Sequence, residues 1–220
     1  MGYRNYIKVT FDSYKCKSKT DEYRTIPIYD GDRLAGFLKP LTYLYKLCRP
    51  AYIDFIYKWR EENPVGFANR FHGNPEKTEN WIDNVLLPRE DRILFMVHAL
   101  DNSPVGHLGL SFFNYETKSC EIDNVVRGQK AFKGLMSLAT KTLIEWGKRF
   151  LGLEDIYLKV LSDNSHAIKF YERLNFRIQD YIPLFKVEKE NMIEWLPLEE
   201  AKSSFSSRPD KYFIVMKLCQ

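Results

Sequence analysis

The sequence has few cysteines, few histidines and little glycine, and each scarcity excludes a class of protein. The four histidines show no HxH or HxxxH spacing, and the cysteines form no CxxC pair, so we expect no metal site and no redox motif. Glycine accounts for 11 of 220 residues, far from the roughly one-third that collagen requires. The four cysteines, which we expect to be reduced, are Cys16, Cys48, Cys120 and Cys219.

Long apolar runs are also missing. No run approaches the roughly 18–20 residues of a membrane helix, and the first fifteen residues lack the apolar stretch of a signal peptide. Tyr6 stands where the N-myristoylation pattern requires Ser or Thr. We therefore expect a cytoplasmic protein that is not attached to a membrane.

The composition that remains is that of an ordinary globular chain, with 45% hydrophobic and 28% charged residues. A length of 220 residues suits one large domain, or one domain with additions. The net charge of +4 is low for a dedicated nucleic-acid-binding protein, so we expect no nucleic-acid partner. The small positive excess suits a polyanionic small molecule instead.

Hydrophobic periodicity predicts a mixed α/β protein. Residues 1–40 form a β-rich N-terminal extension in this prediction, with alternation over 6–11 and a hairpin turn at Asp30–Asp32. Helices are predicted over 50–63, 75–87, 135–146 and 164–174. Strands are predicted over 93–97, 104–110, 120–126, 156–161, 182–185 and 212–216, with a charge-rich insertion before the last. The short serine run Ser203, Ser204, Ser206 and Ser207 is typical of a loop.

Residues 125–136 run from a predicted strand through a basic, glycine-containing loop into an amphipathic helix. The first-turn N–H groups of a helix have no intrahelical acceptor, and the helix dipole favours negative charge beside them. Arg127, Lys130 and Lys133 add positive charge. The pattern is that of an anion cradle suited to a pyrophosphate, although a solvated strand–helix connection would have the same composition.

Residues 162–176 form a second stretch whose side chains could take part in catalysis or binding. Asn164 or Ser165 can cap the predicted helix. Tyr171 follows Asn164 by seven residues, which is two turns along the same face. An amide and a phenol would then line one side of a cleft; the alternative is a capped helix with a core tyrosine.

Together, these two stretches resemble the GNAT superfamily of acyl-CoA-dependent N-acyltransferases, over residues 50–218. The second stretch is similar to the family pattern N-x-x-A-x-x-x-Y-x-x-x-G-F, matched by Asn164, Ala167, Tyr171 and Phe176, with Asn175 at the glycine position. Asparagine tolerates the left-handed conformation that glycine supplies there. The first stretch is similar to the pyrophosphate loop Q/R-x-x-G-x-G/A, matched by Gln129 and Gly134, with Phe132 in place of the first glycine.

The resemblance implies a GNAT domain over 41–220. Its mixed central sheet, flanked by helices, would carry a V-shaped split between two central parallel strands at 123–126 and 157–161. Acetyl-CoA, or another acyl-CoA, would be the co-substrate. The residues that the resemblance assigns to it are Asn124, Val125, Val126, Arg127, Gln129, Lys130, Ala131, Phe132, Lys133, Gly134, Leu135 and Asn164.

Acyl transfer to an amine needs a base, an oxyanion donor and an acid. Glu121 and Asp123 lie two residues apart on one predicted strand and therefore share a face, so either could be the base. His107 is a third candidate, and water a fourth. Tyr171 is similar to the tyrosine that protonates the thiolate in this family, and the N–H of Val125 or its neighbour would stabilise the oxyanion.

The acceptor region of the family carries aromatic, arginine and asparagine side chains here, which suit a sugar or a nucleotide. The residues expected to bind the acceptor are Trp59, Arg60, Asn63, Arg70 and His72. Local similarity favours the branch that acts on nucleotide-linked amino sugars. Alternatives are a protein or peptide N-terminus, as in ribosomal-protein acetyltransferases, then polyamines, antibiotics or amino acids, and a degenerate module that acts by protein interaction. Residues 1–40 could cap the site or form a homodimer contact.

Overall fold

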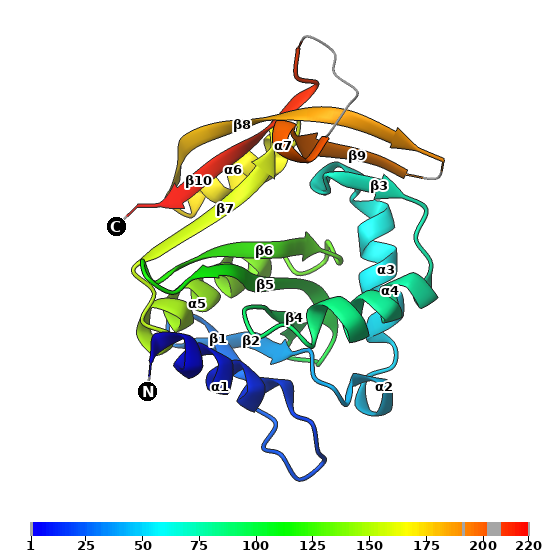
Figure 1. Ribbon diagram of the computed structural model, residues 1–220. Coiled ribbons are helices and arrows are strands. Elements are labelled where there is room, and N and C mark those ends of the chain that lie inside the picture. Colours follow the sequence, from blue (N-terminus) through cyan, green and yellow to red (C-terminus); the bar gives the residue numbers. More distant parts are fainter. Residues whose placement is uncertain (1, 191, 202–207, 220) are drawn as a thin grey trace. The chain divides into compact units, whose positions relative to one another are not determined.

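The computed structural model describes residues 2–190, 192–201 and 208–219 (Figure 1). The chain forms two compact units, and each is described by itself. The first comprises Met1–Trp59 and Asn74–Ile156, and the second comprises Arg60–Gly73 and Tyr157–Gln220. The serine run predicted as a loop, from Ser203 to Ser207, lies outside the described residues.

The first unit is built on antiparallel strands in the order β1-β2-β4-β5-β6 (Figure 1). The strands are β1 (Ile26–Asp30), β2 (Arg33–Pro40), β4 (Ile93–Ala99), β5 (Pro104–Asn114) and β6 (Ser119–Arg127). The helical segments are α1 (Tyr3–Lys15), α2 (Tyr45–Cys48), α3 (Tyr52–Glu62), α4 (Pro75–Trp81), the π-helical turn η2 (Ile82–Leu86) and α5 (Leu135–Phe150). The last residues of α3, from Arg60, belong to the second unit. The predicted hairpin at Asp30–Asp32, the three central strands and the three helices predicted in this part of the chain are confirmed.

The strand predicted over residues 6–11 is wrong, because this segment is part of helix α1. The buried side chains of α1 are Ile7, Phe11 and Lys15, which recur every four residues and so lie on one helical face. Phe11 stacks on Trp146 of α5, with ring centroids 6.4 Å apart. Six residues are too few to distinguish strand alternation from a helical period. Packing against α5 selects the helix here.

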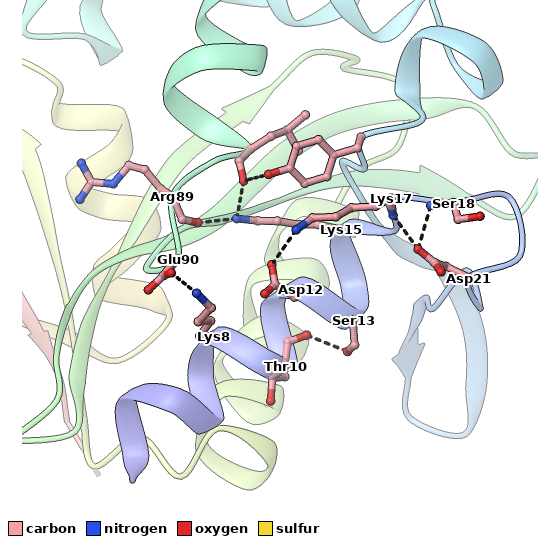
Figure 2. A network of polar contacts seen from close by, with 12 residues as sticks. Lys8, Thr10, Asp12, Ser13, Lys15, Lys17, Ser18, Asp21, Arg89 and Glu90 are labelled. Atoms are coloured by element: carbon pink, nitrogen blue, oxygen red, sulfur yellow. Dashed lines mark hydrogen bonds and ion pairs between the residues drawn. The ribbon is translucent and has the colours of Figure 1, made fainter. Parts of the chain in front are cut away.

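Lys15, the last residue of α1, links this helix to the segment that follows η2 (Figure 2). Its amine is buried and donates to the carbonyl oxygens of Leu87, at 3.0 Å, and Arg89. The phenol of Tyr43 donates to the same Leu87 oxygen at 2.9 Å. Lys8, two turns earlier on α1, pairs with Glu90. These contacts attach the N-terminal helix to the first unit.

Burial lowers the pKa of the Lys15 amine from 10.5 to about 8. Between these pH values the folded chain has lost the proton and the unfolded chain keeps it, so stability rises with pH across this window. Below about pH 8 the amine is charged in both states and the dependence ends.

Replacing this amine is expected to remove the pH dependence. Relative to Lys15→Met, the wild-type chain should gain up to ~3 kcal/mol of unfolding free energy as pH rises through the window. Urea denaturation of both proteins at a series of pH values measures the difference, in which other titrating groups cancel. Parallel stability curves would contradict the assignment.

The second unit is also antiparallel, in the order β7-β10-β8-β9-β3. Its core contains Leu161, Leu184 and Trp195. The strands are β3 (Asn69–Phe71), β7 (Asp155–Leu161), β8 (Phe176–Lys189), β9 (Met192–Pro197) and β10 (Lys211–Leu218). The helices are η1 (Pro64–Gly66), α6 (Ser165–Arg173) and α7 (Leu198–Ala201).

The predicted helix at α6 and the predicted strands at β7 and β10 are confirmed. The predicted strand over 182–185 is only the middle of the 14-residue β8, and the charge-rich insertion contains β9. Most side chains of β8 are exposed, so charged residues interrupt the apolar alternation that reveals a strand. Within the described ranges, no helix has both the length and the apolar character needed to cross a bilayer.

Candidate functional site

A β-bulge lies in the middle of β6. His107 of β5 pairs with Val126, whereas Gly109 pairs with Asp123, so two residues of β6 face one of β5. Asn124 has a left-handed φ of +53° at this point. The bulge breaks the simple alternation of the strand and sets the direction of the backbone that follows.

Glu121 and Asp123 precede the bulge and share a half-buried face, as predicted, because the intervening Ile122 is buried. The Asp123 carboxylate accepts hydrogen bonds from the backbone N–H of Asn124 at 2.7 Å and its Nδ2 at 2.8 Å. Ser111 Oγ donates to it at 3.1 Å, and Arg92 Nη2 lies 3.3 Å away. Asp123 is therefore committed to groups of its own unit. The sequence motifs contain no signal for Arg92, since only the folded sheet brings it to Asp123.

His107 is buried on β5 beside the bulge. Its Nδ1 lies 2.7 Å from the carbonyl oxygen of Asn124. A carbonyl oxygen can only accept, so Nδ1 carries the proton and donates. In the neutral ring, Nε2 is then the basic nitrogen. The ring stacks on Trp59, with centroids 6.1 Å apart and planes at 30°.

Trp59 lies beneath the start of the basic loop. Its side chain is buried, with 4% exposed, and stacks on Phe55 with ring centroids 5.3 Å apart. A Cβ atom on Gly128 would lie 1.9 Å from Trp59 Cε2, so the indole contacts the glycine backbone directly. The indole is therefore enclosed by groups of its own unit, and the acceptor contact of Trp59 stays a prediction.

Hydrogen bonds hold the first residues of the loop from Gly128 to Gly134. The amides of Gly128 and Gln129 both donate to the carbonyl of Val105 at 2.8 Å. The Arg127 guanidinium donates to the carbonyl oxygens of Gln129, at 3.3 Å, and Lys130, at 2.7 Å. Arg127 thus holds the loop carbonyls, and its contact with the acyl-CoA stays a prediction.

The opposite end of the loop provides the helix N-terminus. Gly134 caps α5 with φ +84°, and no atom lies within 4 Å of where its Cβ would be. Its carbonyl accepts from the amides of Ser137 and Leu138, which leaves the amides of Leu135 and Met136 in the first turn without an intrahelical acceptor. An anion can therefore approach the loop and the positive end of the helix dipole. The residues present fit the pyrophosphate of an acyl-CoA.

Phe132 does not disturb this geometry. It stands at the first glycine position of the family pattern, but it is not among the residues with positive φ. An L side chain is therefore compatible with the backbone there. Lys130 and Lys133 flank it with exposed side chains, so the positive charge of the loop is directed to solvent and to any bound anion.

In the second unit, α6 carries Asn164 and Tyr171. Asn164 is the N-cap, and its Oδ1 accepts from the Ala167 amide at 3.1 Å. Tyr171 is 8% exposed and makes edge-on contacts with Phe170 and Phe176. Asn175 ends the helix with φ +68°. The predicted cap and the predicted left-handed asparagine are confirmed.

A cavity of about 620 Å³ lies within the second unit. It is formed by the end of α3, η1, β3 and the β8–β9 hairpin. Three of the residues predicted to bind the acceptor, Arg60, Arg70 and His72, line it. Asn63 does not line it, and Trp59 belongs to the first unit. The other charged and aromatic residues of the lining are Glu61, Phe67, Phe71, Lys189 and Glu190.

Arg60 is held between two aromatic rings of this cavity. Its guanidinium carbon lies 4.0 Å from the centroid of Phe67 and 4.8 Å from that of Phe71. It donates to Asn69 Oδ1 at 2.7 Å and to the Asn69 carbonyl at 3.2 Å. Burial lowers the pKa of this guanidinium, which still remains protonated at neutral pH.

Arg70 lies over Trp195, with its guanidinium carbon 4.6 Å from the ring centroid. Its Nε is buried and has no hydrogen-bond partner in the described part of the chain. Across those same residues, neither Arg70 nor Arg60 forms an ion pair with a carboxylate. Lys189, in contrast, pairs with Glu194. The cavity therefore presents two arginines that form no ion pair with a carboxylate among the described residues. The charge of Glu61, which lines the same cavity, still acts on Arg60 and partly offsets the lowering of its pKa by burial.

Comparison with models of known protein families shows which family the chain belongs to. The model described as "Acetyltransferase (GNAT) family" matches residues 53–176. The chain belongs to this family. The predicted α/β GNAT fold is confirmed, and the chain is an acyl-CoA-dependent N-acetyltransferase. No curated protein sequence matches the chain significantly.

Solved structures with this fold include polyamine acetyltransferases. A spermidine/spermine N-acetyltransferase from Vibrio cholerae, with manganese ions, is 16% identical, with a TM-score of 0.54 over 84% of this chain and 92% of that one. A Vibrio cholerae spermidine N-acetyltransferase in complex with CoA and spermine is 17% identical, with a TM-score of 0.55 over 78% and 91%. At this identity the similarity establishes the fold and leaves the acceptor open.

Proposed function

We propose that this GNAT enzyme transfers an acyl group, normally acetyl, from acyl-CoA to the primary amine of an amino sugar carried on a nucleotide. The observation that supports the acceptor class is the cavity of the second unit, where neither Arg60 nor Arg70 forms an ion pair with a carboxylate of the described residues. Guanidinium groups bind phosphate oxygens in bidentate fashion. Aromatic side chains beside them suit a base or a sugar ring.

Charge argues against a polyamine in the same cavity. A polyamine is a polycation, and it would meet the guanidinium groups of Arg60 and Arg70. Lys189 is paired with Glu194, and the acidic residues of the lining are Glu61 and Glu190. The Glu61 carboxylate already accepts from the Gly73 amide at 3.2 Å. An acceptor with a diphosphate avoids the like-charge repulsion that a polycation would experience.

For the donor, the loop and first turn of α5 would bind the pyrophosphate through the amides of residues 130–136. Lys130 and Lys133 would add charge. The backbone of Asn124, Val125 and Val126, turned by the bulge, would pair with the pantetheine arm. Asn164 would contact that arm or order the site through its cap.

The reaction is direct attack of the neutral amine on the thioester carbonyl. The amine proton goes to Glu121 or to Nε2 of His107, directly or through water. The Val125 N–H donates to the oxyanion of the tetrahedral intermediate. The C–N bond forms, the C–S bond breaks, and the Tyr171 phenol gives its proton to the departing thiolate. In this proposal Asp123 holds the bulge and does not accept the proton.

An acceptor panel tests this proposal. We expect acetyl transfer from acetyl-CoA to a uridine-diphosphate amino sugar, and little transfer to spermidine or to an N-terminal peptide. Arg70→Met should lower kcat/KM for the nucleotide sugar about 10- to 100-fold, because a charge-assisted contact to phosphate is lost. Arg177→Met is the matched control, since Arg177 lies on β8 and, among the described residues, its hydrogen bonds go to backbone carbonyls.

Other outcomes identify the alternatives. Faster transfer to spermidine, with no effect of Arg70→Met, would replace the acceptor class by a polyamine. Transfer to the peptide would favour a protein acceptor. Acetyl-CoA binding without transfer to any amine would favour a module that acts by protein interaction.

A further inference from the structure

Two residues with left-handed backbone conformation lie on the neighbouring strands β5 and β6, close to Asp123. Phe112 on β5 and Asn124 on β6 both have φ +53°. A bulky aromatic residue in this region is a genuine conformational outlier. The pairing of β5 with β6 is shifted near both positions. Such backbone is strained, and it persists only where surrounding contacts impose it.

The contacts that impose it converge on one carboxylate. Asp123 binds both the amide and the side chain of Asn124, and it also accepts from Ser111, the residue before Phe112. His107 holds the Asn124 carbonyl from the other side. The orientation of the peptide that follows Asn124 is therefore set by Asp123 and His107 together.

Arg92 fixes Asp123 in turn. Its Nη2 lies 3.3 Å from Asp123 Oδ2, and its guanidinium carbon lies 5.6 Å from the centroid of Phe112. The Arg92 side chain is only 13% exposed and the Asp123 side chain 31%, so this pair is less screened than a surface pair. In the described part of the chain, Asp123 is the one carboxylate with which Arg92 pairs. One guanidinium thus contacts both distorted strands.

We propose that Arg92 is a positioning residue for acyl transfer. Through Asp123 it holds the bulge that directs the Asn124–Val126 backbone toward the thioester and its oxyanion. This inference rests on the proposed role of that backbone in donor binding. Arg92 itself touches neither substrate, and Asp123 acts as its intermediary and not as the base.

Kinetics of four variants test the proposal. Arg92→Met and Asp123→Asn should each lower kcat about 10- to 100-fold and weaken acetyl-CoA binding, with the acceptor KM nearly unchanged. The double variant should be no worse than the poorer single one, because both changes break the same link. Arg92→Lys should recover part of the loss, since it retains the charge but not the fork geometry. Arg89→Met is the control, because Arg89 pairs with Asp91 on the surface.

A pH profile separates positioning from catalysis. Asp123→Asn should keep the midpoint of the acidic limb of kcat, since the proton acceptor is another group. Loss of that limb would make Asp123 the base and overturn the proposal. Additive losses in the double variant, or an Arg92→Met enzyme equal to Arg89→Met, would also overturn it. If Arg92→Met fails to fold, Arg92→Lys and Asp123→Asn carry the same test.

The wild-type protein distinguishes failure of this inference from failure of the proposed function. Calorimetry with acetyl-CoA, and turnover with the acceptor panel, report on the function without reference to Arg92. A wild-type enzyme that binds and transfers, with Arg92 variants unaffected, would remove only the positioning role. A wild-type protein that neither binds nor transfers would remove the function on which it rests.

Discussion

Gly134→Glu is expected to abolish acetyl-CoA binding, with an affinity loss of at least about 100-fold. Gly134 opens α5 with φ +84°, and the space beside its Cα is empty. A carboxylate there would occupy the position of the pyrophosphate. Two like charges about 4 Å apart near a protein surface repel by about 4 kcal/mol, which corresponds to roughly three orders of magnitude in affinity.

Calorimetric titration with acetyl-CoA measures this effect. Gly134→Asn is the matched control, because asparagine tolerates the left-handed region and brings no charge. We expect it to retain most of the affinity, whereas Gly134→Ala adds backbone strain alone. Unchanged binding by Gly134→Glu would mean that the acyl-CoA phosphates lie elsewhere, and the loop would then be an ordinary connection between β6 and α5.

Gly128→Ala is expected to lower both stability and acyl-CoA affinity. The added methyl group would lie 1.9 Å from Cε2 of Trp59, so either the indole or the loop must move. Overpacking of this kind costs about 1–3 kcal/mol. Trp59 is held by Phe55 and His107, and we therefore expect the loop to yield, with displacement of the amides that bind the anion.

Thermal unfolding and acetyl-CoA titration of the same samples measure the two consequences. Gly66→Ala is the control, since no atom lies within 4 Å of its Cβ position. Trp59→Phe should relieve Gly128→Ala, so that the double variant loses less than the sum of the single ones. Strictly additive losses would show that the two side chains do not share this contact.

Local patterns in the sequence were sufficient to predict the helices and turns that carry the family motifs. The period of α5, the cap of α6 and the left-handed turn at Asn175 each depend on a few neighbouring residues. The period and the turn were predicted correctly, and Asn164 is one of the two cap residues that the sequence allowed. The order of the two motifs along the chain by itself implied the GNAT family. The role of Tyr171 and the domain boundary at residue 40 stay predictions.

Other features depend on partners that are distant in sequence. Most of β8 and all of β9 were not predicted from the sequence, because charged side chains interrupt their apolar alternation. Pairing between the strands defines them instead. The contact of Trp59 with Gly128 joins α3 to the loop after β6, and no local pattern predicted it. Residues 6–11 alternated like a strand, although helix α1 packs against α5.

The sequence by itself determined the family, the acyl-CoA chemistry and the positions of the loop and the capped helix, because each is a property of contiguous residues. Only the tertiary structure brought Arg92 to Asp123, and Arg60 and Arg70 into one cavity. Ion pairs and cavities are formed by side chains from separate elements. Their geometry therefore follows from sheet register and packing, which no short stretch of sequence specifies.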